Sequence, residues 1–426
     1  MKIKSISIKN YKGFENFSAE FHDELTVIVG DNGAGKSSLL DAVSIAAGTF
    51  LTDFNQGTSI SKEDALLKSF DMGSVIDLQP QFPVIISAKG SVDQQPISWR
   101  RELNSANGRT TITNAREMTQ LSSEYSKAVM EGDTNKILPV LSYYGTGRLW
   151  AQKKEKRDGN LVRFTRQMGY TDCLAAESNE KLMKKWFEKM TIQGSQNGGI
   201  SPELSAVQQA VSMCFEGITG YSDIKTFFNL DTHSLDIQYT DPTGKRMRYP
   251  TEALSDGYKN TLSMIADIAY RMAVLNPFLL GDVLVETPGL VLIDEIDLHL
   301  HPLWQQRILN DLRRIFPKVQ FIVTTHAPSV IHSVKKENLL ILSDNTTAYP
   351  PVCEVYGSDA NEILESVMGA RKRPPEIQEM FNNFYNAMDS DNYIHAREIL
   401  KAIEMLIGSN DSEYVSAAVS LDLAEL

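Results

Sequence analysis

The stretch LTVIVGDNGAGKSSLLDAV, residues 25–43, decides the fold class. It begins with a compact apolar run, which predicts a buried strand, and the apolar spacing after Lys36 predicts a helix. Between them, residues 30–37 follow the pattern G-x-x-x-x-G-K-S, in which glycines let successive backbone N–H groups face a phosphate. A chance glycine turn is the alternative, but the flanking strand and helix supply the context that the motif requires. Strand, glycine-rich turn and helix in this order indicate a nucleotide-binding α/β core.

The polar side chains of this loop are suited to ATP and Mg²⁺. Lys36 offers a point charge to the β- and γ-phosphates, and Ser37 offers a hydroxyl to Mg²⁺, which prefers oxygen ligands. The N-terminus of the following helix adds the positive end of its dipole. The residues that we expect to bind the nucleotide here are Asn32, Gly33, Gly35, Lys36, Ser37 and Ser38.

A second stretch, VLIDEIDLHLHP at residues 291–302, places three acids and two histidines within eight positions. A zinc site is one alternative, but His299 and His301 lack further ligands at suitable spacing. A P-loop needs a second acid that orients Mg²⁺ at the end of a neighbouring buried strand, and Asp294 directly follows an apolar run. Glu295 is placed to accept the proton of the water that attacks the γ-phosphate. The stretch therefore predicts a magnesium-binding acid followed by a general base.

Two other segments carry polar residues that are suited to a phosphate. His326 ends the next buried strand, in IVTTHAP, so its side chain could reach the γ-phosphate; a satisfied polar residue at a strand end is the alternative. LSDGYK, at the start of a long helix predicted over residues 256–275, would present Ser255 and the backbone of Gly257 at a helix N-terminus. That motif alone favours neither a phosphate contact nor a plain N-cap.

Element patterns divide the chain of 426 residues into three parts. Strands and helices alternate regularly in the segments near the two ends of the chain, which together form the core. Hairpin signals and helices fill the segment between them. We expect hairpin turns at Asn107-Gly108 and at residues 241–244, and two tail helices over residues 376–407 that break at residues 389–391. The expected division is a split P-loop core at 1–50 and 250–345, an antiparallel β lobe and helical insertion at 51–249, and a helical C-terminal tail at 346–426.

Composition and charge disfavour some classes of protein. The net charge of −12 argues against a surface that coats nucleic acid along its whole length. A local basic stripe at residues 153–157 with Arg163 and Arg166, or at residues 371–373, is the alternative to a plain solvated surface. No apolar run reaches the length of a membrane span, and the three cysteines form no CxxC pair, which indicates a cytoplasmic protein with reduced thiols.

Together these motifs resemble the ABC-type ATPases of the SMC, RecF and OLD group. The opening IKSISIKNYKGFENF is similar to the start of that group, and LSDGYK resembles its signature LSGGQ but departs at Asp256 and Tyr258. VLIDEIDLHLHPLWQ resembles the Walker B and D-loop of the OLD-like branch, which implies a nucleotide contact for Asp297, and VTTHAPS resembles its switch histidine. No glutamine takes the place of the group's Q-loop; residues 141–150 are the candidate replacement, with Arg148 expected near the phosphates, and an ordinary glycine turn is the alternative.

This resemblance implies a P-loop ABC-type ATPase head of the α/β class. Such a head has a mixed sheet with flanking helices and an antiparallel β lobe, here joined by a helical insertion and a helical C-terminal tail. Heads of this group pair head to tail around two ATP molecules. The P-loop and Walker B residues of one copy, with His326, would then face Ser255 and Gly257 of the other copy. We therefore expect self-association that depends on ATP.

A closer resemblance is to the PtuA ATPases of Septu antiphage systems, which pair with a small HNH nuclease. It rests on YYGTGRLW at residues 143–150 and on the tail at residues 356–381. It implies an ATP-hydrolysing switch that regulates a partner nuclease in antiphage defence.

Other members of the group provide alternative functions. A RecF-like repair clamp would bind DNA without a nuclease partner. An OLD nuclease is disfavoured, because the residues after the last predicted core strand are too few for a TOPRIM lobe. A transporter subunit is disfavoured by the long insertion and by the missing Q-loop glutamine.

Overall fold

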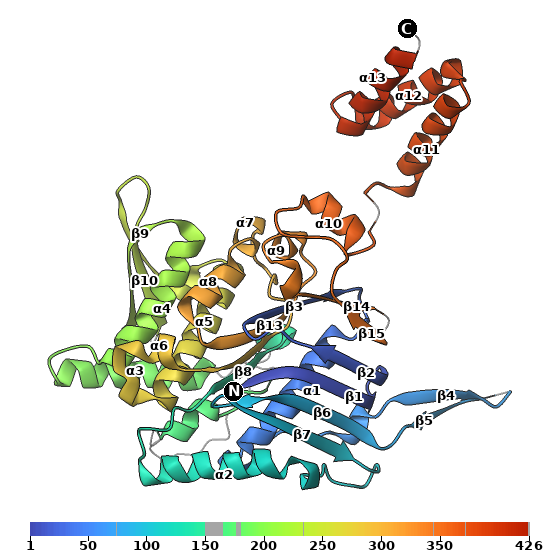
Figure 1. The fold of residues 1–426 in the computed structure, drawn as a ribbon. Helices are drawn as coiled ribbons and strands as arrows, with labels where there is room; N and C mark the ends of the chain where they lie inside the picture. Colours follow the sequence, from blue (N-terminus) through green and yellow to red (C-terminus); the bar gives the residue numbers. More distant parts are fainter. Residues whose placement is uncertain are drawn as a thin grey trace. The chain divides into compact units, whose positions relative to one another are not determined.

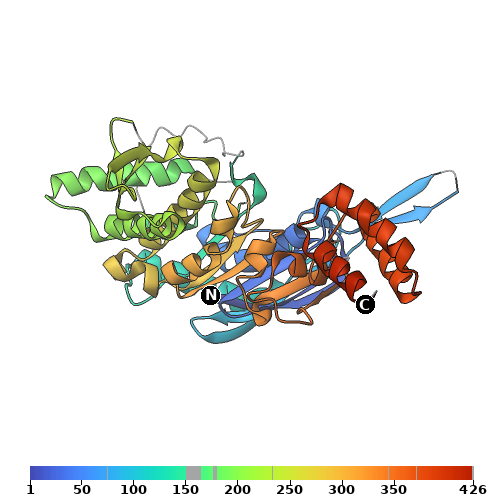
Figure 2. The same ribbon diagram turned by 90° about the horizontal axis from the view of Figure 1, so that it is seen from above.

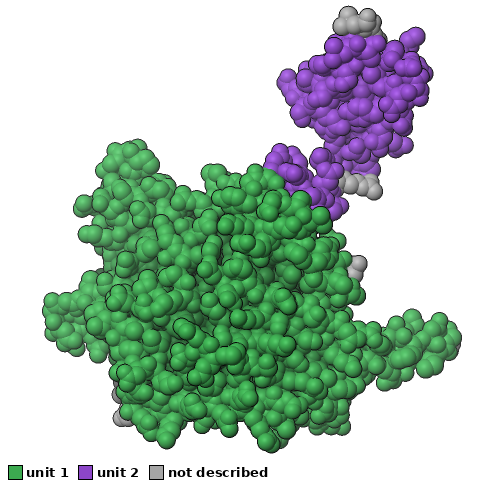
Figure 3. Space-filling model, viewed as in Figure 1, with its two compact units in different colours: residues 1–358 green, residues 359–426 purple. Residues whose placement is uncertain are grey.

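The computed structural model describes residues 1–73, 75–149, 165–175, 180–232, 234–343, 345–370 and 372–424. The chain forms two compact units, residues 1–358 and residues 359–426 (Figure 3). The first unit contains the motifs that are expected to bind ATP, and the second unit belongs to the predicted helical tail.

The core of the first unit is a mixed sheet of six strands in the order β15-β14-β3-β13-β12-β8. β15 is antiparallel at one edge, and every other neighbouring pair is parallel. The parallel strands are almost continuously buried, as expected of strands that are covered on both faces. The strands span Leu25–Gly30 (β3), Val140–Tyr144 (β8), Gly289–Ile293 (β12), Val319–Thr324 (β13), Leu339–Ser343 (β14) and Thr347–Tyr349 (β15).

A second, antiparallel sheet has the order β2-β1-β6-β7. Several of its strands alternate buried and exposed residues, which is the pattern of a sheet with one covered face. The P-loop helix α1 (Lys36–Ala47) contacts strands of both sheets, and the Trp99 indole N–H donates to the Ala46 carbonyl at 2.9 Å. Because α1 is enclosed in this way, it is buried on most sides. The strands span Lys2–Tyr11 (β1), Phe14–Glu20 (β2), Val84–Val92 (β6) and Gln95–Leu103 (β7).

These features confirm the expected fold class, a mixed sheet with flanking helices beside an antiparallel β lobe. The strands differ from the expected division of the chain in two places. β1 pairs with β2 and with β6 in the antiparallel sheet, and β8, from the middle of residues 51–249, forms one edge of the core sheet. Pairing between distant strands depends on packing against their neighbours, which a local pattern does not encode. We therefore propose a core that includes one strand from the middle segment.

The two predicted hairpins have different outcomes. The turn expected at residues 241–244 is confirmed between β10 and β11. At Asn107-Gly108 the chain turns as expected, with the Gly108 N–H donating to the Ser105 carbonyl at 3.0 Å, but β7 ends at Leu103 and only an isolated antiparallel bridge joins Glu102 and Thr111. A regular hairpin that was not predicted turns at Asp93-Gln94, between β6 and β7, whose buried faces contact α1.

Other elements complete the first unit. The helix predicted over residues 256–275 is confirmed as α5 (Asp256–Leu275). Figures 1 and 2 both show the β4–β5 hairpin extending away from the rest of this unit. The remaining elements are β4 (Leu67–Asp71), β5 (Ile76–Pro80), α2 (Arg116–Glu131), α3 (Glu180–Gln196), α4 (Pro202–Thr219), β9 (Ser222–Asn229), β10 (Ser234–Thr240), β11 (Arg246–Pro250), α6 (Val283–Glu286), α7 (Pro302–Gln305), α8 (Ile308–Ile315) and α9 (Pro328–Ile331).

The described residues of the second unit form four helices: α10 (Ala360–Ser366), α11 (Pro375–Asp389), α12 (Tyr393–Ile407) and α13 (Ser412–Ala424). α11 and α12 confirm the two predicted tail helices and the break between them. The third long helix, α13, was not predicted, because its apolar residues do not gather on one face. The three long helices share a core that includes Phe381, Phe384, Leu400, Ile403 and Leu421.

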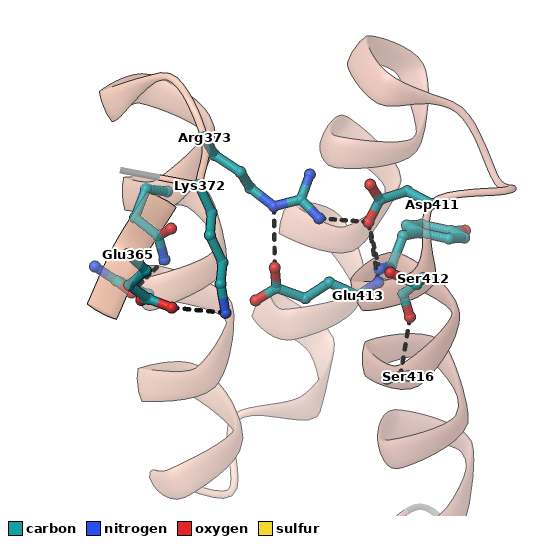
Figure 4. A network of polar contacts seen from close by, with 10 residues as sticks. Glu365, Lys372, Arg373, Asp411, Ser412, Glu413 and Ser416 are labelled. Atoms are coloured by element: carbon teal, nitrogen blue, oxygen red, sulfur yellow. Dashed lines mark hydrogen bonds and ion pairs between the residues drawn. The ribbon is translucent and has the colours of Figure 1, made fainter. Parts of the chain in front are cut away.

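A polar network also holds α13 in the second unit (Figure 4). Arg373, just before α11, donates from Nη2 to Asp411 Oδ1 at 2.7 Å and from Nε to Glu413 Oε2 at 3.0 Å. Asp411 Oδ1 also accepts from the backbone N–H groups of Glu413 and Tyr414, at 3.0 and 3.1 Å, so it caps the first turn of α13. The start of α13 is therefore fixed to the beginning of α11.

Candidate nucleotide-binding site

The P-loop leaves the sheet at Gly30, the last residue of β3, and enters α1 at Lys36. Gly33 and Gly35 adopt left-handed backbone conformations, with φ of 86° and 90°. A Cβ atom at Gly35 would also lie 2.7 Å from the Phe14 ring and 2.3 Å from Asn345 Oδ1, so only glycine fits there. Asn32 and Gly33 are exposed in the loop, and Ser38 lies in the first turn of α1.

Lys36 is buried beneath this loop. Its Nζ donates to the carbonyl oxygens of Gly30 and Asp31, at 2.8 and 2.9 Å. Burial lowers the pKa of Lys36, and the nearby carboxylates, Asp294 first among them, oppose that shift. The ammonium is thus held against the backbone of the loop that the sequence predicts to enclose the phosphates.

Asp294 connects the P-loop to the two neighbouring strands. It follows β12 and is buried, and its Oδ2 accepts a hydrogen bond from Ser37 Oγ at 2.6 Å. Its Oδ1 accepts from Thr324 Oγ1, at the end of β13, also at 2.6 Å. Its backbone N–H donates to the carbonyl of Tyr144, at the end of β8, at 2.8 Å. The carboxyl ends of the parallel strands β3, β13, β12 and β8 therefore lie at the same end of the sheet.

Glu295 has an unusual backbone conformation, with φ of 48°. Such a conformation costs roughly 1–3 kcal/mol for a residue other than glycine and needs support from its surroundings. The Glu295 N–H donates to Thr324 Oγ1 at 2.8 Å, and the Ile296 N–H donates to the Thr324 carbonyl at 3.0 Å. Thr324 therefore positions both Asp294 and Glu295. Sequence reasoning missed it, although a polar residue that ends a buried apolar strand is a recognisable signal.

Asp297 lies close to the segment that carries His326. Its Oδ1 accepts from Thr325 Oγ1 at 2.6 Å, and Thr325 Oγ1 accepts from the Ala327 N–H at 3.0 Å. His326, between these two residues, is half-buried just beyond β13. His326 follows β13, and β13 lies between β3, which leads into the P-loop, and β12, which leads to Asp294.

The two histidines after Asp297 do not form part of a metal cluster in the part of the chain that the structure describes. No three or more His, Cys, Asp or Glu side chains there are arranged to hold a metal ion. His301 instead caps α7, because its Nδ1 accepts from the Leu303 N–H at 3.3 Å.

Ser255 and Gly257 lie at the start of α5 and are not hydrogen-bonded to the P-loop in the described part of the chain. Ser255 is the exposed N-cap residue of α5, and its side chain makes no capping hydrogen bond. A Cβ atom at Gly257 would lie 2.4 Å from the His299 carbonyl oxygen, and Tyr258 packs on Trp304 with ring centroids 4.0 Å apart. Within the described residues, no hydrogen bond joins Ser255 or Gly257 to the P-loop. The start of α5 packs instead on the segment that follows Asp297.

The candidate Q-loop segment begins with β8, which joins two helices. The Tyr143 hydroxyl donates to Asp41 Oδ1 of α1 at 2.9 Å, and the Tyr144 hydroxyl donates to Asp267 Oδ2 of α5 at 2.7 Å. Burial raises the pKa of Tyr144 well above its ordinary value, and the Asp267 carboxylate adds to that shift. Arg148, the expected phosphate contact, has a side chain that lies outside the described residues, as do residues 153–157, Arg163 and Arg371.

The buried pair of Asp267 and Arg271 predicts a large effect on stability. Arg271 Nε donates to Asp267 Oδ2 at 2.8 Å, and Arg271 Nη1 donates to the carbonyls of Gly169 and Thr171. We expect Asp267→Ala to lower the free energy of unfolding by about 3–5 kcal/mol, because the guanidinium stays buried without its carboxylate. Urea unfolding followed by tryptophan fluorescence measures this, since every tryptophan of the chain lies in the first unit.

The control for this prediction is Asp231→Ala, which removes an exposed carboxylate from the turn between β9 and β10. Equal unfolding midpoints for the two variants would show that Asp267 contributes no more than a surface acid.

Comparisons with known proteins show which proteins this chain resembles. A family model described as "AAA domain" matches residues 5–216, and one described as "AAA domain, putative AbiEii toxin, Type IV TA system" matches residues 219–332. The chain is 26% identical to the "Retron Ec83 probable ATPase" of Escherichia coli, over 99% of this chain and 87% of that protein. It is 24% identical to the "Septu protein PtuA" of Bacillus thuringiensis, over 92% of this chain and 90% of that protein.

Two models of AAA domains thus match successive parts of the chain, and its full-length relatives are named as a probable ATPase and as PtuA. Among solved structures it is similar to the Smc head bound to the C-winged helix domain of ScpA, with 17% identity and a TM-score of 0.48 over 82% of this chain and 97% of that chain. Within the described residues, no helix is long and apolar enough to cross a membrane.

Proposed function

We propose that the chain binds ATP with Mg²⁺ and hydrolyses it to ADP and phosphate at the carboxyl ends of β3, β12 and β13. The observation that carries this proposal is the hydrogen bond of 2.6 Å between Ser37 Oγ and Asp294 Oδ2. These residues are 257 positions apart in the sequence, and both were predicted to bind the same metal ion. A fold that joins them supports a single site for both.

The donor set fits magnesium. A serine hydroxyl and a carboxylate offer only oxygen atoms, and Mg²⁺ prefers oxygen ligands and retains several waters. Ser37 and Asp294 would hold the ion, with Asp294 oriented by Thr324. When bound, Mg²⁺ neutralises charge on the phosphates.

The other residues of the site have roles that follow from their positions. Lys36 and the backbone N–H groups of the P-loop, from Asn32 to Ser38, bind the phosphates. Glu295 accepts the proton of the attacking water. His326 contacts the γ-phosphate, and Asp297 holds the adjoining segment through Thr325.

Two copies of the chain complete the site in this proposal. Within the described residues, neither Ser255 nor Gly257 makes a hydrogen bond to the P-loop of its own chain, and Ser255 is exposed at a helix N-terminus, which is suited to a phosphate. A second head would supply these groups across a head-to-tail pair. ATP would then favour the closed pair through its higher affinity for that state, and hydrolysis would release it.

The names of the relatives support a role in defence. They include a retron ATPase and a Septu protein, each matched over most of the length of this chain. We infer that the chain acts in the cytoplasm as an ATP-dependent switch that regulates a partner nuclease of the HNH type in antiphage defence. An HNH nuclease encoded beside the chain supports this role, whereas a replication or repair operon supports a RecF-like clamp that binds DNA.

Metal removal tests the proposed site. We expect chelation of magnesium by EDTA to reduce ATP hydrolysis to background and a zinc-selective chelator to leave the rate unchanged. Asp294→Asn should lower the rate by at least about a hundredfold, because a neutral amide orients Mg²⁺ poorly. His299→Ala and His301→Ala should have milder effects than Asp294→Asn, and phosphate release assays compare all three.

Elemental analysis provides the opposing result. Zinc bound in stoichiometric amount, and lost in the two histidine variants, would contradict the magnesium assignment and support the zinc alternative.

A further inference from the structure

The outer face of α13, turned away from the core of the second unit, carries an apolar stripe that no described residue of that unit covers. Val415, Val419 and Leu423 are 47%, 53% and 66% exposed, and their spacing of four residues places them along one side of the helix. The opposite side of α13 contributes Ala417 and Leu421 to the core of the second unit. α13 is therefore apolar both toward its own unit and toward its surroundings, which is typical of a helix that is covered on both sides.

A ridge of small residues lies beside this stripe. Ser416 Oγ donates to the Ser412 carbonyl at 2.9 Å, and Ser420 Oγ donates to the Ser416 carbonyl at 2.9 Å; Figure 4 shows the first of these bonds. The ridge is low because serine side chains are short. It is only weakly polar, because these hydroxyl protons are used within the helix. A low ridge beside an apolar ridge, both with a spacing of four residues, suits packing against another helix.

The stripe is displayed on a fixed helix. Arg373 bonds Asp411 and Glu413, and Asp411 caps the first turn of α13. A partner that binds here would not have to order this helix first, which lowers the entropic cost of binding.

Charge decides which kind of partner fits. Residues 359–426 contain thirteen Asp or Glu and five Lys or Arg, a formal net charge of −8, while the whole chain carries −12. A second copy of this unit would bring like charge against like charge, and nucleic acid would add a further polyanion. A polypeptide of positive charge is attracted at long range and can still bury the stripe.

We propose that the outer face of α13 docks a positively charged amphipathic helix of a partner protein. The apolar face of that helix covers Val415, Val419 and Leu423, and its basic residues face the acidic surroundings of the second unit. This inference extends the proposed function, from which it takes only the presence of a protein partner. It places recognition of that partner on the tail, apart from the ATP site.

Binding of a defined peptide to the full chain tests the proposal. The probe is a fluorescent helix with leucines at heptad positions a and d and lysines elsewhere, and fluorescence anisotropy at about 0.15 M salt measures its affinity. Two control peptides have the same composition in scrambled order, or glutamates in place of the lysines. We expect the full chain to bind the probe at least about tenfold more tightly than either control peptide.

Matched substitutions locate the binding surface. Val415→Asp, Val419→Asp and Leu423→Asp change exposed residues, so they should preserve the fold, which circular dichroism checks. Each should weaken probe binding at least about tenfold. The control is Met130→Asp, at a methionine of α2 in the first unit that is 75% exposed, and it should leave binding unchanged.

Three results would overturn the inference. The scrambled peptide binding as tightly as the probe would show attraction by charge alone. Probe binding that survives all three stripe substitutions would place the contact elsewhere. An oligomer of the full chain that falls apart in the stripe variants during sedimentation would show that the stripe joins two copies. Failure of the proposed function is distinguishable, because it appears as absent ATP hydrolysis in the parent protein, while the peptide assay needs no ATP.

Discussion

Glu295→Gln is expected to slow ATP hydrolysis by at least about two orders of magnitude and to leave ATP binding intact, since loss of a general base usually costs about 10²- to 10⁴-fold. The amide has nearly the size of the carboxylate but does not accept a proton. The unusual backbone conformation of residue 295 should persist, because the backbone N–H of residue 295 still donates to Thr324 Oγ1 in this variant. Single-turnover phosphate release measures the chemical step, and titration with a fluorescent ATP analogue measures binding.

A matched variant makes this result specific. Glu117→Gln carries out the same chemical change at an exposed position of α2 and should hydrolyse ATP at the parental rate. If Glu295→Gln also hydrolysed ATP at the parental rate, another group would be the base. If it lost ATP binding as well, Glu295 would serve to hold the site together rather than to accept the proton.

Ser255→Arg is expected to prevent the ATP-driven pairing of two heads while each head still binds ATP. Ser255 is exposed at the start of α5, and the proposed pair brings it within hydrogen-bond distance of a phosphate held by the other copy. A long arginine side chain does not fit into that space. We expect the pair to dissociate at least about a hundredfold more readily, which corresponds to about 2.8 kcal/mol. Sedimentation with a non-hydrolysable ATP analogue measures the pairing.

Two controls separate pairing from general damage. Ser123→Arg places the same side chain at an exposed position of α2 and should pair like the parent protein. Ser255→Ala removes only the hydroxyl and should pair more weakly than the parent but better than Ser255→Arg. An unchanged ATP-dependent pair in Ser255→Arg would contradict the two-head arrangement.

The sequence alone was sufficient for elements that depend on neighbouring residues. The P-loop strand and helix, the helix over residues 256–275 and the turn at residues 241–244 all lie where they were predicted. Each is specified locally, by an apolar period, by a glycine that allows a left-handed turn or by a short loop between alternating strands. The pair Asn107-Gly108 shows the limit of such signals, because the chain turns there but only one isolated bridge, between Glu102 and Thr111, forms across the turn.

Contacts between distant segments required the tertiary structure. Thr324 holds Asp294 from the next strand, Tyr144 joins β8 to Asp267 of α5, and β8 enters the core sheet from the middle of the chain. The spacing of apolar residues along the sequence does not predict these contacts, because each depends on how strands pair and on which side chains packing brings together. The sequence by itself therefore determined which residues we expect to carry the chemistry of phosphate and magnesium. Only the tertiary structure decided that Ser37 and Asp294 are in hydrogen-bond contact and that Gly257 packs on the His299 carbonyl, since strand order and helix packing set the distances between residues far apart in the chain.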